Sequence, residues 1–143
     1  MSVETNYSDN LSKIKKFLSH SQFHILSNLC SSSEESEHFI AIVSNQAAII
    51  ELMPITYEQD GLGDDSIIHL HYFLNGCDWY IIEKDMEGGV LQAYGFVILH
   101  NDLYNAEMGY ISISEIVKHG AEMDFYFDKK TIGKLKKEHG IRG

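Results

Sequence analysis

Cysteines are scarce in this chain, and long apolar runs are missing. Only Cys30 and Cys77 occur among its 143 residues, which makes a disulfide framework unlikely and leaves no cysteine pair of the metal-binding type. No run approaches the roughly 20 apolar residues that span a bilayer, and residues 1–10 lack the basic and apolar regions of a signal peptide. We therefore expect a cytoplasmic protein with no membrane partner.

Basic residues are almost missing from the middle of the chain. Between Phe17 and Asp128 there are 18 acidic residues and only two basic ones, Lys84 and Lys118, a net charge of −16 against −10 for the whole chain. An acidic body repels nucleic acid and attracts basic partners. The same charge is also typical of a surface that serves solubility alone.

Sequence motifs for nucleophilic catalysis and phosphate binding are missing too. The chain has no G-x-S-x-G, and its glycine pairs at 61–63 and 88–89 lack the residues that follow in a phosphate loop. His69 and His71 are two apart on an expected strand and could form a two-histidine metal edge, but the spacing specifies no third ligand. We therefore expect no bound metal and no cofactor.

The first third of the chain is patterned for helices. Apolar residues at helical spacing from Leu11 to Leu18 predict a helix that Ser8 or Asp9 could cap. Residues 39–52 hold two short apolar runs rich in β-branched side chains, which favours a hairpin. A single helix over residues 36–53 is the alternative, because such short runs do not settle the period.

From Ser66 onward the pattern is mostly that of strands. Asn75-Gly76 is the strongest hairpin signal, and Asp128 could cap a last helix. Segregated strands and helices predict an α+β fold with an antiparallel sheet of about five strands and flanking helices. We expect one domain over residues 1–143, with a helical or hairpin portion at 1–60 and a sheet-rich core at 66–140.

Three segments of the sheet-rich core occur in an order and spacing known from a bacterial family. They are Trp79-Tyr80-Ile81-Ile82-Glu83, Tyr94-Gly95-Phe96 and the stretch from Glu107 to Ile116. A fourth element of the same pattern follows them at Glu122-Met123-Asp124-Phe125-Tyr126-Phe127. Over roughly residues 68–132 the chain resembles the family called domain of unknown function 2958, with Asp78 and Met123 where that family usually has threonine and arginine. The resemblance implies no activity, but it implies a context of mobile genetic elements, near anti-restriction and conjugation genes.

Three carboxylates fall in or beside these motifs and are the catalytic candidates if the protein is an enzyme: Glu83, Glu107 and Asp124. Because side chains alternate between the two faces of a strand, we expect Glu83 on the same face as Trp79. Burial there could suit Glu83 for general acid–base catalysis. Two or three such groups could also hold Mg²⁺ for phosphodiester cleavage. The simpler alternative is that all three are structural or solvent-facing residues at strand ends.

The leading hypothesis is a non-enzymatic acidic accessory protein of a mobile genetic element. Its acidic face would engage a basic protein surface, such as that of a nucleic-acid-binding enzyme, in a DNA-mimic or anti-defence role without direct contact to nucleic acid. The alternative is a small metal-dependent nuclease or hydrolase. The expected partner-binding residues are loop acids and two aromatic residues: Glu58, Asp60, Asp64, Asp65, Asp85, Glu87, Trp79 and Tyr110.

Overall fold

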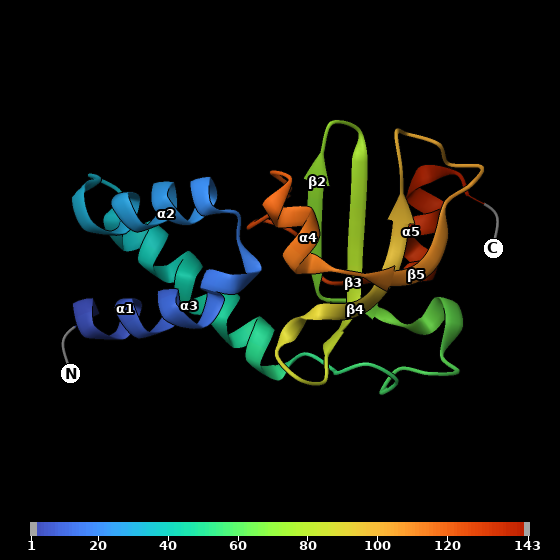
Figure 1. Cartoon of the computed structure of the whole chain (residues 1–143), viewed down its shortest axis with the longest axis horizontal. Coiled ribbons are helices and arrows are strands. Elements are labelled where there is room, and N and C mark those ends of the chain that lie inside the picture. Colours follow the sequence, from blue (N-terminus) through green and yellow to red (C-terminus); the bar gives the residue numbers. More distant parts are fainter. Residues whose placement is uncertain (1–2, 142–143) are drawn as a thin grey trace.

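Three helices and a single 3₁₀ turn form a layer at the N-terminal side. The computed structural model describes the backbone of residues 3–141 and the side chains of residues 7–141. The helical layer consists of α1 (Val3–Ile14), η1 (Lys15–Phe17), α2 (His20–Ser32) and α3 (Ser36–Leu52) (Figure 1). The apolar stripe from Leu11 to Leu18 is buried as predicted. The expected caps Ser8 and Asp9 lie inside α1, because the helix begins further upstream.

The preferred hairpin at residues 39–52 is wrong, and the alternative of one helix is confirmed by α3. The buried residues of α3 recur at the spacing of one helix face: Ile42, Val43, Gln46, Ala47 and Ile50. That face packs against α1 and α2. Packing against neighbouring helices therefore overrides the strand preference of the β-branched side chains.

A five-stranded antiparallel sheet forms the second layer, in the order β5-β4-β3-β2-β6. Its strands are β2 (Leu70–Leu74), β3 (Cys77–Asp85), β4 (Gly89–Ile98), β5 (Glu107–Ile111) and β6 (Glu122–Met123). A small second sheet pairs β1 (Ile67–Ile68) with β7 (Lys130–Thr131). The Asn75-Gly76 turn joins β2 to β3 with φ angles of 47° and 81°, as the hairpin signal predicted. The α+β class and the number of strands are confirmed.

Three short helical elements complete the fold: η2 (Gly63–Asp65), α4 (Ile113–Lys118) and α5 (Ile132–His139). The last helix is capped by Thr131, whose hydroxyl accepts from the backbone N–H of Lys134, and not by Asp128. Ser112 caps α4 in the same way through the N–H of Glu115. Among residues 3–141, no helix combines the length and the apolar character needed to cross a bilayer.

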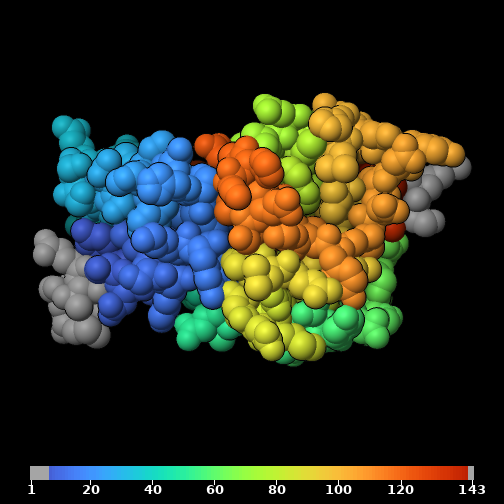
Figure 2. Space-filling model, in the orientation of Figure 1, coloured from blue at the N-terminus to red at the C-terminus, as the bar shows by residue number. Residues whose placement is uncertain are grey.

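Two hydrophobic clusters lie on the two faces of the five-stranded sheet. The first contains Phe17, Val43, Tyr72 and Ile81 and joins the helical layer and α4 to one face. The second contains Tyr80, Phe96, Ile132 and Leu135 and joins α5 to the opposite face. Figure 2 shows the helical layer in direct contact with α4 and with the turn between β3 and β4. The sheet is therefore covered by helices on both faces.

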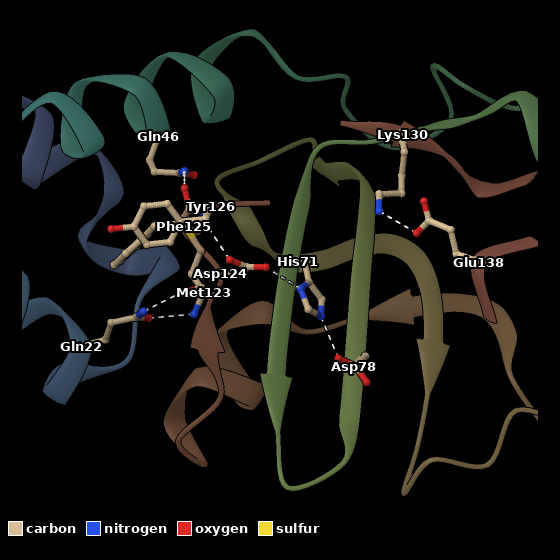
Figure 3. A network of polar contacts seen from close by, with 10 residues as sticks. All are labelled: Gln22, Gln46, His71, Asp78, Met123, Asp124, Phe125, Tyr126, Lys130 and Glu138. Carbon is tan, nitrogen blue, oxygen red and sulfur yellow. Dashed lines mark hydrogen bonds and ion pairs between the residues drawn. The ribbon is translucent and has the colours of Figure 1, made fainter. Parts of the chain in front are cut away.

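Two glutamines of the helical layer cover the edge strand β6 and the residues that follow it. The side chain of Gln22 accepts from the N–H of Met123 and donates to its carbonyl, both at 2.8 Å. The buried Gln46 donates to the carbonyl of Phe125 at 3.1 Å (Figure 3). These side chains make the hydrogen bonds that a neighbouring strand would otherwise make, so this edge of the sheet is closed.

We expect the stability of the protein to depend on pH because of His69, which lies between β1 and β2. Burial, and then the positive charge of Lys129, lower its pKa to about 4 from 6.5. Between about pH 4 and pH 6.5, the unfolded chain binds a proton at His69 that the folded protein does not bind. Stability therefore falls as the pH falls from about 6.5 towards about 4. We expect His69→Gln to flatten the curve of unfolding free energy against pH in this window, measured by urea denaturation. Curves with the same slope for both proteins would contradict the prediction.

Candidate partner-binding cavity

Glu83 is a buried carboxylate at the base of the site, with only 3% of its surface exposed. It lies in β3 beside irregularities in the pairing with β4. Its two oxygens accept hydrogen bonds from the backbone N–H groups of Tyr57, at 2.9 Å, and of Gln59, at 2.6 Å. Among the side chains of residues 7–141, no lysine, arginine or histidine forms an ion pair with it. Glu83 therefore fixes a loop but keeps an unneutralised charge.

Gln59 fixes the same loop from the other side. Its buried amide donates to the carbonyls of Ile67, at 3.0 Å, and Ile82, at 2.9 Å, and its side-chain oxygen accepts from the N–H of Ile67. We call residues 56–66 the acidic loop, because they include Glu58, Asp60, Asp64 and Asp65. The loop has little regular structure, yet buried hydrogen bonds hold it in one conformation.

Three tyrosines meet at this site, one from the acidic loop and two from neighbouring strands. Tyr94 of β4 and Tyr110 of β5 are cross-strand partners whose rings pack edge to face, with centroids 5.2 Å apart. The hydroxyl of Tyr110 lies 2.8 Å from that of Tyr57. The hydrogen bond with Tyr57 raises the pKa of Tyr110, and the charge of Glu83 adds to this shift. Tyr57 has a φ of 79°, a strained conformation for a bulky residue.

These residues enclose a cavity of about 610 Å³ between the acidic loop, the sheet and α5. Its lining includes the three tyrosines and four charged residues: Asp60, Asp64, Glu83 and Lys136. The ammonium of Lys136 is 2.9 Å from Asp64, so these two charges offset each other. The charges of Asp60 and Glu83 are left, and the cavity is net negative. We call it the tyrosine cavity.

The acids expected to bind a partner divide into two groups in the structure. Asp60 and Asp64 line the tyrosine cavity together with Tyr110, and Asp65 follows in η2. Glu58 accepts from the N–H of Ile55 within its own turn. Asp85 and the exposed Glu87 lie at the turn between β3 and β4, where Asp85 organises the backbone by accepting from three N–H groups. Trp79 is half-buried against the first hydrophobic cluster.

The three candidate catalytic carboxylates are not brought together. Glu107 is exposed on the edge strand β5, and Asp124 follows β6 at the opposite edge, about 19 Å away at the usual strand spacing. Asp124 instead contacts His71 at 3.2 Å, while the other ring nitrogen of His71 lies 2.8 Å from Asp78 (Figure 3). In the described part of the chain, no group of three or more His, Cys, Asp or Glu residues is arranged to hold a metal.

Tyr57, Gln59 and Tyr94 belong to the site but were missed by the sequence interpretation. Tyr57 carried one usable signal, an aromatic residue at the start of a polar, glycine-rich loop. Gln59 carried none, because its role comes from hydrogen bonds to segments far along the chain. Comparison with protein-family models, with curated proteins and with solved structures finds no match to this chain. Its function is therefore inferred from the geometry of the site.

Proposed function

We propose that this protein is a non-enzymatic acidic binding protein whose acidic loop and tyrosine cavity engage a basic surface of another protein. One observation carries the proposal. The acidic loop places few side chains in the hydrophobic core, yet hydrogen bonds to buried Glu83 and Gln59 fix its conformation. Its carboxylates are therefore presented in one arrangement. A surface used only for solubility does not need such an anchor.

Preorganisation and charge both favour binding at this loop. A loop that is already ordered loses less conformational entropy when a partner binds. Of its four acids, only Asp64 forms an ion pair within the described side chains, with Lys136. Negative potential at the loop would steer a basic partner and raise the rate of association.

The resemblance to the domain of unknown function 2958 family supports a more specific form of the proposal. In that form the protein is an accessory factor of a mobile genetic element, and its partner is a nucleic-acid-binding enzyme. The carboxylates would then occupy the basic surface that normally contacts phosphates. The hydrolase alternative has less support, because Glu107 and Asp124 lie at opposite edges of the sheet.

Neutralising acids of the loop should weaken binding to a basic probe more than neutralising acids elsewhere. The probe is a fluorescein-labelled oligolysine peptide, and the measurement is fluorescence anisotropy at about 0.1 M and about 1 M salt, where the Debye length is about 10 Å and about 3 Å. The test variant is Asp60→Asn with Asp65→Asn, two exposed residues. We expect its Kd at low salt to rise about tenfold, roughly 1.4 kcal/mol, and the difference to shrink at high salt.

The control is Glu34→Gln with Glu122→Gln, which changes net charge equally at exposed positions in the turn between α2 and α3 and on β6. The change in log Kd caused by the control should be less than about a third of the change caused by the test variant. Equal weakening by both pairs would show that overall charge alone attracts the probe. The proposal of a dedicated binding surface would then be wrong.

A further inference from the structure

We infer that the tyrosine cavity receives the cationic end of a single lysine or arginine side chain from the basic partner. The inference rests on the proposed function and specifies what the cavity binds. It depends on three properties of the cavity: an unpaired buried charge, aromatic walls and a suitable size.

The charge argument begins with Glu83. Buried carboxylates in proteins are normally paired with a cation or a metal, but Glu83 has two backbone N–H donors and no cationic partner among the described side chains. The nearby Lys136 does not supply that charge, because its ammonium contacts Asp64 and lies 5.7 Å from the ring centre of Phe96. A cation entering beside Glu83 and Asp60 would supply the missing positive charge.

The aromatic argument concerns Tyr57, Tyr94 and Tyr110. Aromatic rings attract ammonium and guanidinium groups through their negative faces, and tyrosine hydroxyls also accept hydrogen bonds from such groups. The edge-to-face packing of Tyr94 on Tyr110 and the hydroxyl contact of Tyr110 with Tyr57 hold the three rings in a fixed arrangement. Carboxylates behind tyrosine walls recognise organic cations better than hydrated inorganic ions, which need several oxygen ligands.

The cavity is large enough to admit such a ligand. Its volume of about 610 Å³ lies within the roughly 300–1,000 Å³ of sites for small organic groups. The same space would leave a bare metal ion without enough ligands, since the described residues offer no cluster of three or more metal-binding side chains. A long side chain with a cationic end can enter the cavity while its own backbone stays at the rim near Asp60.

The test is the effect of Tyr110→Leu on binding of fluorescein-labelled oligolysine and oligoarginine to the whole chain. Tyr110 is 53% exposed, so its truncation removes the ring without opening the core. We expect Kd to rise about five- to thirtyfold, the range that cation–π contacts supply, whereas Tyr110→Phe keeps most of the affinity. The matched control is Tyr104→Leu, because Tyr104 is 95% exposed and outside the cavity lining. An oligolysine with acetylated side chains should not bind.

A second variant keeps the test valid if Tyr110→Leu does not fold. Tyr57→Leu removes another wall of the cavity but keeps the backbone N–H that Glu83 binds, and it should weaken both peptides in the same direction. If both leucine variants remain folded and bind like the parent while Asp60→Asn with Asp65→Asn weakens binding, the cavity inference is wrong and the proposed function stands. If the parent binds neither peptide, the proposed function itself is wrong.

Discussion

Replacing Gly95 with alanine should unfold the protein or lower its free energy of unfolding by more than about 3 kcal/mol. Gly95 lies in β4 opposite Ile81 of β3. An added Cβ would overlap the carbonyl oxygen of Tyr80 and lie 3.0 Å from the Cα of Ile81. These are backbone atoms in the centre of the sheet, so the clash can be relieved only by separating β3 from β4.

Gly109→Ala is the matched control, because Gly109 is the direct partner of Gly95 on β5. A Cβ at Gly109 meets no atom within 4 Å. Alanine there should leave stability unchanged or raise it by about 0.4–1 kcal/mol, since it restricts the unfolded chain. Urea denaturation of both variants provides the measurement. Equal midpoints would show that β3 and β4 are not as close at Gly95 as the structure has them.

The second large effect is expected for Glu83→Ala, which removes the acceptor of two buried N–H groups. Each unsatisfied N–H costs about 1–3 kcal/mol, so the free energy of unfolding should fall by about 2–4 kcal/mol after partial relief by water. The acidic loop should also lose its fixed conformation. Hydrogen exchange checks this directly, because the amides of Tyr57 and Gln59 should lose their protection.

Glu107→Ala is the control for Glu83→Ala. Both residues are glutamates in strands of the same sheet, but Glu107 is exposed at the start of β5. Its replacement should change stability by less than about 0.5 kcal/mol and leave the exchange of the loop amides as in the parent. Retained protection of Tyr57 and Gln59 in Glu83→Ala would mean that other contacts fix the acidic loop.

The sheet could be predicted from the sequence because several local signals agree there. The Asn75-Gly76 turn and the runs rich in β-branched and aromatic residues on either side of it agree in indicating antiparallel strands. The local signals disagree in the region of α3, because its runs of β-branched residues favour strands. The helix is favoured only by the packing of one face against α1 and α2, which the local sequence does not reveal. The cap of α5 was misplaced for a related reason, because β7 extends the chain past Asp128 before the helix begins.

The site could be predicted only in part. The exposure of Asp60, Asp64 and Asp65 follows from a polar, glycine-rich segment. The meeting of Tyr94 with Tyr110 depends on the register of β4 against β5, and residue spacing alone does not give that register. The role of Glu83 depends on hydrogen bonds to residues 24 and 26 positions away. Local patterns carry no information about contacts of that range.

The contacts of Gln22 and Gln46 with β6 and the residues after it also decide where the chain can be divided. A fragment beginning after Met53 would keep every residue of the tyrosine cavity. It would lose Gln22 and Gln46, and the buried hydroxyl of Tyr72 would lose its acceptor, the carbonyl of Phe17. Such a fragment would expose an open strand edge and would tend to self-associate. The helices that contribute no residue to the cavity are thus what closes the edge of its supporting sheet.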